Sequence, residues 1–206
     1  MDSMALQKIG CGLYLISTTL DGQDCGCVAN TLMQVTASPV KLAITLNKEN
    51  CTEQMMEKSG VFAAVALSEE ADMDLIGEFG FKKSCEVNKF RKFPHRRDEA
   101  QVPYVTAMAS ARMSCKIVDR LDLGTHVMFI GELTEAEVLS PEAPMTYGYY
   151  HEVKKGTTPK NAPSYREESG KGYQCSICGY HLESDIIPEG FVCPICGMGP
   201  DKLVKL

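Results

Sequence analysis

Long hydrophobic runs are missing from this chain of 206 residues. The longest unbroken apolar run, residues 61–67, is far shorter than the roughly 18–20 residues that span a bilayer. The first residues also lack a basic region followed by an apolar one, so we expect no signal peptide. These absences predict a soluble, cytoplasmic protein with no membrane partner.

An excess of positive charge is missing too. The chain holds 21 Lys and Arg against 27 Asp and Glu, for a formal net charge of −6. Nucleic-acid binders owe most of their affinity to the neutralisation of phosphates, so we expect no nucleic-acid partner. A chain that is 44% hydrophobic and 23% charged is globular, not disordered.

Cysteines are too few for a disulfide scaffold of this length, at 10 in all. Four of them lie in residues 173–206, and such pairs in a reducing compartment indicate a metal before a disulfide. The other six have no metal-pair spacing and are expected to pack as small apolar side chains. They are Cys11, Cys25, Cys27, Cys51, Cys85 and Cys115.

Strand-length runs rich in β-branched and aromatic residues dominate the first 140 residues. They cover 40–46, 61–67 and 126–130, with a weaker candidate at 113–118. Many strands with few helices and no repeat period predict a mainly β fold built on an antiparallel barrel.

Two helices are expected between these strands. The first runs from about residue 50 to 58, with Asn50 as its N-cap, Glu53 in capping-box position and Gly60 as its stop. The second spans about 71–79 and ends at Gly80.

The composition changes after residue 150. Residues 151–172 are rich in Gly and Pro, which predicts a linker between a domain at 1–150 and a second unit at 173–206. A unit of 34 residues is too small to fold on an apolar core alone and needs a metal or disulfides.

Two CxxCG knuckles lie in this second unit, separated by 14 residues. Their cysteines, Cys175 with Cys178 and Cys193 with Cys196, supply four thiolates for one tetrahedral ion. The glycine after each second cysteine permits the turn that aims backbone N–H groups at sulfur. Four sulfurs suit both zinc and iron, so the spacing leaves the metal open.

The residues around the knuckles resemble rubredoxin. The chain reads Tyr-Gln-Cys-Ser-Ile-Cys-Gly-Tyr over 173–180 and Phe-Val-Cys-Pro-Ile-Cys-Gly over 191–197. The short gap is similar to the compact unit at the end of rubrerythrins, and the chain lacks the tryptophan of full-length rubredoxins. This resemblance implies one iron that carries single electrons.

A structural zinc ribbon is the alternative. Ribbons that bind nucleic acid need a basic surface, but residues 173–206 carry two lysines against four carboxylates. A nucleic-acid ribbon is therefore not expected, while a ribbon that only folds or docks stays open.

An anion site is indicated where the first helix begins. A helix N-terminus offers free N–H groups and the positive end of its dipole, and here Lys48 and Thr52 add a cation and a hydroxyl. Upstream, residues 30–39 are dense in small hydroxyl and amide side chains and are expected to lie between two apolar strands. The plainer alternative is that Asn50 only caps the helix and Lys48 is a solvated charge.

Five ordered motifs in residues 8–150 resemble the flavin reductase-like, FMN-binding split-barrel family, which includes flavoredoxins and ferric reductases. They include Asn-Thr-x-x-Gln-Val-Thr-Ala-Ser-Pro at 30–39 and Leu-Asn-Lys-x-Asn-x-Thr at 46–52. The family implies a homodimer that holds FMN and reduces it with NADH or NADPH.

This resemblance also assigns the flavin site. It places Asn30, Thr31, Gln34, Thr36 and Ser38 at the ring and ribityl chain, Asn47, Lys48, Asn50 and Thr52 at the phosphate, and Phe81 and Lys89 nearby. The chain reads Lys-Ser-Cys at 83–85, where family members often have Ser-Gly-Arg, so the contacts of that loop and the choice of reductant stay open. The basic stretch over 82–97 either assists the dinucleotide or is a solvated loop, and His126 either lies near the flavin or is structural.

The pairing of the two units resembles the flavin reductase–rubredoxin fusions called high-molecular-weight rubredoxins. It implies an NAD(P)H-dependent FMN oxidoreductase that passes electrons through the iron to a partner redox protein of the flavodiiron type. The alternatives are a flavin or ferric reductase with a structural zinc ribbon, and a non-enzymatic FMN-binding protein with a docking ribbon.

Overall fold

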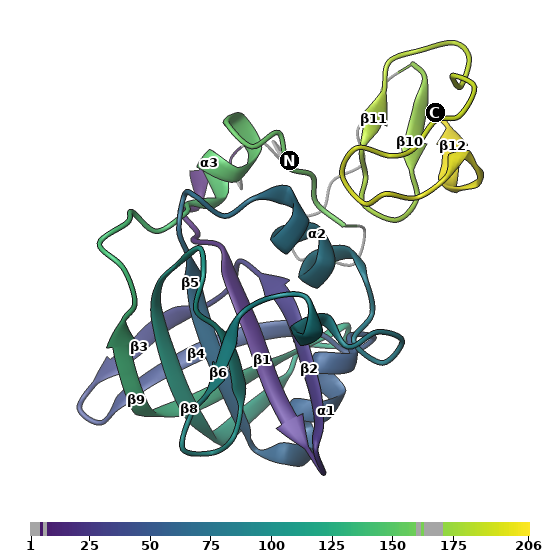
Figure 1. Cartoon of the computed structure of the whole chain (residues 1–206). Coiled ribbons are helices and arrows are strands. Elements are labelled where there is room, and N and C mark those ends of the chain that lie inside the picture. Colours follow the sequence, from purple (N-terminus) through teal and green to yellow (C-terminus); the bar gives the residue numbers. More distant parts are fainter. Residues whose placement is uncertain (1–4, 6–7, 160–161, 163–170) are drawn as a thin grey trace.

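The first domain is built on one antiparallel sheet, as expected for a mainly β fold. The computed structural model describes residues 5, 8–159, 162 and 171–206 (Figure 1). Seven strands lie in the order β2-β1-β5-β8-β9-β4-β3, and every pair is antiparallel. They are β1 (Tyr14–Leu20), β2 (Gln23–Ala29), β3 (Met33–Ala37), β4 (Val40–Asn47), β5 (Val61–Leu67), β8 (Ala109–Asp122) and β9 (His126–Val138).

The strands alternate between two cores. Leu15 and Val65 belong to one cluster of buried side chains, and their neighbours Ile16 and Ala64 belong to the other. This alternation follows from the two-residue period of a strand. The sheet is therefore apolar on both faces, and helices cover parts of it (Figure 1).

Helix α1 (Cys51–Ser59) begins and ends as the sequence predicts. The Asn50 side chain accepts from the Thr52 N–H at 2.9 Å, and Gly60 ends the helix with a φ of 71° in the left-handed region that glycine tolerates. The capping box is not completed through Glu53 Oε1, which is buried and has no hydrogen-bond partner among the described residues.

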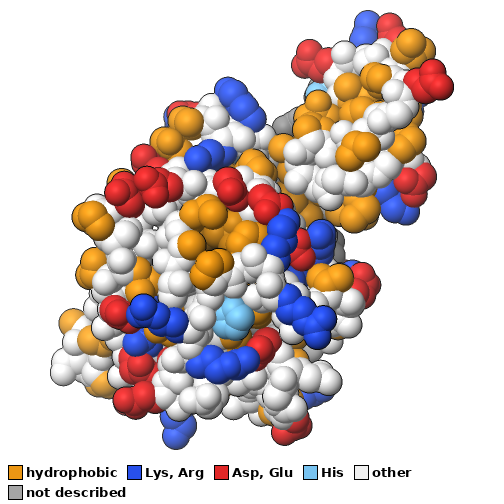
Figure 2. Space-filling model, in the orientation of Figure 1, with side chains coloured by type: hydrophobic (Ala, Val, Ile, Leu, Met, Phe, Trp, Pro, Cys, Tyr) orange, Lys and Arg blue, Asp and Glu red, His pale blue; other side chains and the backbone are white. Residues whose placement is uncertain are grey.

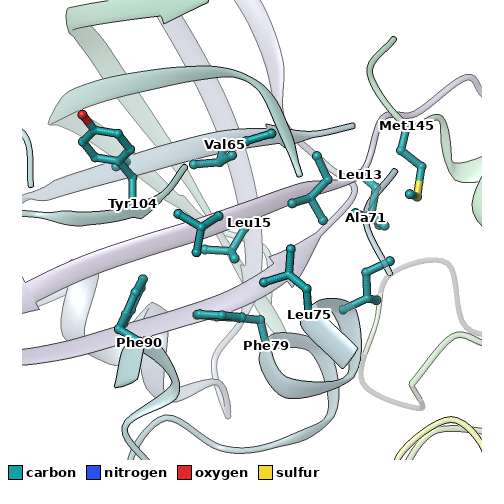
Figure 3. Packing of buried hydrophobic residues seen from close by; sticks show 14 of the residues in the cluster. Leu13, Leu15, Val65, Ala71, Leu75, Phe79, Phe90, Tyr104 and Met145 are labelled. Atoms are coloured by element: carbon teal, nitrogen blue, oxygen red, sulfur yellow. The ribbon is translucent and has the colours of Figure 1, made fainter. Parts of the chain in front are cut away.

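Helix α2 (Met73–Phe81) differs from the prediction at both ends. Its N-cap is Asp72, which accepts from the Leu75 N–H at 2.9 Å. The expected stop at Gly80 was wrong, because Gly80 has no positive φ and the helix continues to Phe81. Leu75, Ile76 and Phe79 are buried on its inner face, where Leu75 and Phe79 point toward Leu13 and toward Leu15 of β1 (Figure 3).

The remaining elements are short. The chain adds η2 (Lys89–Arg91), the hairpin β6 (His95–Arg97) and β7 (Pro103–Val105), and α3 (Tyr147–Glu152), which crosses the expected domain boundary at residue 150. The second unit holds a three-stranded sheet in the order β11-β10-β12, with η3 before its last strand. These elements are β10 (Tyr173–Cys175), β11 (His181–Leu182), η3 (Pro200–Lys202) and β12 (Leu203–Lys205). Among the described residues, no helix has the length and apolar character that a membrane crossing requires.

Candidate metal and flavin sites

The four knuckle cysteines come together in one cage. Their sulfurs all lie within 4.8 Å of one another. The Sγ atoms of Cys175 and Cys196 are 3.6 Å apart, and those of Cys178 and Cys193 are 3.5 Å apart. Bonds of about 2.3 Å from a tetrahedral ion place sulfurs about 3.8 Å apart, so the cage fits one such ion.

The knuckle turns supply the local reason for this geometry. Gly179 and Gly197 have φ values of 83° and 71°, and each donates its N–H to the carbonyl of the first cysteine of its knuckle at 2.9 Å. Burial raises the pKa of the Cys178 and Cys196 thiols, that of Cys196 to about 12. A bound cation is therefore needed to keep all four sulfurs ionised together.

The residues predicted for the flavin phosphate gather around the start of α1. Asn47 Oδ1 accepts from the Glu49 N–H at 2.8 Å, and Asn50 caps the helix. Thr52 is fully buried, and its Oγ1 has no hydrogen-bond partner among the described residues. An unpartnered hydroxyl beside the free N–H groups of a helix start fits a phosphate.

Lys48 is not a free cation at this site. Its Nζ lies 2.7 Å from both carboxylate oxygens of Asp122 at the end of β8. A phosphate at the helix start therefore competes with Asp122 for this charge.

The ring-side residues are only partly brought together. Asn30 and Thr31 lie near the residues predicted to bind the phosphate. Thr31 Oγ1 donates to the carbonyl of Thr45 in β4 at 2.7 Å, and Thr45 is two residues before Asn47. The stretch expected to lie between strands instead contains β3, an edge strand exposed throughout. Gln34, Thr36 and Ser38 therefore follow this edge toward the β3–β4 turn, and the seven steps of β4 place that turn about 20 Å from Asn47.

The two remaining predicted flavin residues have partners of their own. Lys89 is 3% exposed, and its Nζ donates to the carbonyls of Gly26 and Phe79 at 2.9 and 3.0 Å. Burial lowers the pKa of Lys89 to about 8. Phe81 packs against the knuckle cysteines of the second unit.

The sequence did not predict one feature near α1, and it gives two alternatives for another, His126. Cys51 and Cys85 form a disulfide that ties the helix start to the loop after α2, so the expectation that they pack singly was wrong. His126 pairs in register with Asn47, and its Nδ1 lies 2.8 Å from Thr125 Oγ1. Its Nε2 is buried without a hydrogen-bond partner among the described residues.

The buried carboxyl of Glu53 is expected to make the stability of the folded chain depend on pH. It is 2% exposed, and burial, together with Glu57, raises its pKa to about 7. Between about pH 4.5 and 7, Glu53 therefore keeps its proton in the folded chain and has lost it in the unfolded chain. The free energy of unfolding falls as the pH rises through this range. We expect Glu53→Gln to remove this slope and to stabilise the chain at pH 8 by about 2–3 kcal/mol.

Denaturant unfolding at pH 5 and pH 8 measures this effect. Glu142→Gln, which changes an exposed carboxyl, is the control. An unchanged pH slope in Glu53→Gln would show that Glu53 is ionised throughout this range.

Two known family models match the two domains of the chain. Residues 6–157 match the flavin reductase like domain, and residues 173–203 match the rubrerythrin, rubredoxin-like domain. The chain belongs to the flavin reductase-like family and carries a C-terminal rubredoxin-like domain. These families imply a flavin in the first domain and a cysteine-bound iron in the second.

Two curated proteins are similar to this chain over most of its length. The chain is 37% identical to the high molecular weight rubredoxin of Moorella thermoacetica, with both chains covered in full. It is 43% identical to the ferric-chelate reductase (NAD(P)H) of Archaeoglobus fulgidus, over 81% of this chain and 99% of that protein. These relatives support an oxidoreductase.

Solved structures share the fold. The flavin reductase HpaC, complexed with NADP+, matches with a TM-score of 0.61 at 19% identity, over 70% of this chain and 89% of that chain. Flavoredoxin from Methanosarcina acetivorans matches with a TM-score of 0.59 at 19% identity, over 66% of this chain and 75% of that chain.

Proposed function

We propose that the protein is an NAD(P)H-dependent FMN oxidoreductase whose electrons leave through a rubredoxin-type iron to a partner redox protein, such as a flavodiiron protein. The observation that carries this proposal is the full-length match to a high molecular weight rubredoxin, in a chain with a preformed four-sulfur cage. A bound flavin supplies the step between a two-electron hydride donor and a one-electron iron. Joining both units in one chain raises their effective concentration for each other.

The chain's own residues have separate tasks in this proposal. The start of α1, with Asn50, Thr52 and Lys48, binds the phosphate of FMN, and Asn30 and Thr31 contact the groups next to it. The four cysteines fix the iron and exclude water from most of its surface, since Cys175, Cys178 and Cys193 are no more than 2% exposed.

We also propose that two chains pair through the edge strand β3. All five of its residues are exposed, including the apolar Met33 and Val35 at 57% and 44%. An unpaired apolar edge otherwise invites aggregation. Sedimentation of the wild-type chain and of Val35→Glu tests this pairing, which requires a dimer in the first and a monomer in the second.

A reductase that hands electrons directly to flavin or ferric substrates is the second candidate, favoured by the 43% identity to a ferric-chelate reductase. Anaerobic addition of NADH, and separately of NADPH, to the native coloured protein separates the candidates. The proposed function requires the flavin and iron absorbances to bleach together, with iron found by elemental analysis. Bleaching of the flavin alone, with zinc in the cage, supports the second candidate, and no bleaching supports a non-enzymatic FMN-binding protein.

A further inference from the structure

Helix α2, which contains Gly77, lies on the side of the first domain that faces the second unit (Figure 1). Gly77 and Phe81 are four residues apart and therefore share one face of the helix. Leu75, Ile76 and Phe79 occupy the inner face and belong to the buried cluster that contains Leu15 and Val65. The outer face of the helix therefore does not contribute to that cluster.

Both outer residues touch the four-cysteine unit. A Cβ added at Gly77 would lie 3.1 Å from the carbonyl oxygen of Ile195, which stands between the two cysteines of the second knuckle. Phe81 packs against the cysteine cluster, and Gly77 is buried. The absence of a side chain at residue 77 therefore allows the knuckle to approach the helix.

The first knuckle meets the segment that follows α3. A Cβ added at Gly179 would lie 3.0 Å from the Thr158 carbonyl oxygen. The segment of residues 157–158 is held in place by α3, because Tyr150 Oη donates to the Thr157 carbonyl at 3.0 Å and accepts from the Thr157 N–H at 3.2 Å. The backbone of the second knuckle thus approaches α2, and the backbone of the first knuckle approaches residues 157–158.

We infer that the outer face of α2, together with residues 157–158, is the docking face for the chain's own rubredoxin-like unit, and that Gly77 determines whether the unit can dock. Figure 2 shows the small unit seated on the larger domain. Docking places the sulfur cage against the flavin reductase-like domain and leaves Ile186, Val192 and Val204, which are 75%, 61% and 54% exposed, for an external partner. A second consequence, which rests on the proposed function, is that docking sets how fast the iron is reduced.

Hydrogen exchange of the full-length, metal-loaded protein tests the docking face directly. We expect Gly77→Leu to speed exchange at least tenfold in peptides from residues 73–81 and 193–198, and Gly77→Ala to give a smaller increase. Gly80→Ala is the matched control: it makes the same change in the same helix, but its Cβ meets only Val28, at an ordinary 3.7 Å. Unchanged exchange in β5 checks that the barrel core stays folded.

The outcomes separate docking from electron transfer. Exchange in both Gly77→Leu and Gly77→Ala that is no faster than in Gly80→Ala, in both peptides, would overturn the docking face. Loss of protection in Gly77→Leu alone supports it, whatever the metal in the cage. If iron reduction by NADH then slows at least tenfold in Gly77→Leu while the flavin is still reduced, the proposed route is supported as well, whereas an unchanged rate counts against that route and leaves docking supported.

Discussion

Replacing both Cys178 and Cys193 with serine is expected to release the metal and to stop electron delivery to an external acceptor protein. Each replacement leaves one knuckle with a single thiolate, and serine is a poor ligand for zinc or iron. Structural metal binding contributes on the order of 10–16 kcal/mol to the folding of such small units. The unit is therefore expected to unfold as a whole, while the barrel keeps its own core.

The expected signature is a loss of metal and of iron absorbance, with FMN retained and still reduced by NADH. Metal analysis, visible spectra and anaerobic transfer to an acceptor protein give the three readings. Cys11→Ser, which changes a thiol outside both the cage and the disulfide, is the control. Delivery at the wild-type rate in the double variant would show that electrons leave from the flavin directly.

The sequence predicted those features whose cause lies within a few residues. The knuckle cysteines are three positions apart and are followed by glycines whose positive φ the turn requires. The cap of α1 is equally local, because the Asn50 side chain binds an N–H two residues away. Both predictions were confirmed for this reason.

Features that join distant segments could not be predicted in this way. Lys48 and Asp122 are 74 positions apart, and nothing near either residue indicates the other. The same holds for the bond between Cys51 and Cys85 and for the contact of Phe81 with the knuckles. Helix α2 passes Gly80 because tertiary packing at Phe81 outweighs the weak local tendency of glycine to end a helix.

Lys48 and Asp122 are expected to change FMN affinity in opposite directions. The phosphate competes with Asp122 for a charge-assisted contact with Lys48, so Lys48→Met is expected to weaken FMN binding by about 1.5–3 kcal/mol, roughly 10- to 150-fold. Asp122→Asn frees Lys48 from its competitor and is expected to strengthen binding. That gain is smaller, about threefold, because the pair is partly exposed and screened by water.

The asparagine change is conservative for the local turn. Asp122 Oδ1 also accepts from the Gly124 N–H at 2.8 Å, and the amide oxygen of asparagine can take this bond. Lys58→Met removes the same charge at the opposite end of α1 and serves as the matched control. Titration of the flavin-free protein with FMN, followed by quenching of flavin fluorescence, measures the three affinities. If the salt bridge had no role in binding, none of the three FMN affinities would change. A weaker affinity in Lys48→Met together with a stronger one in Asp122→Asn therefore ties the phosphate to the start of α1. Equal affinities would place the phosphate elsewhere.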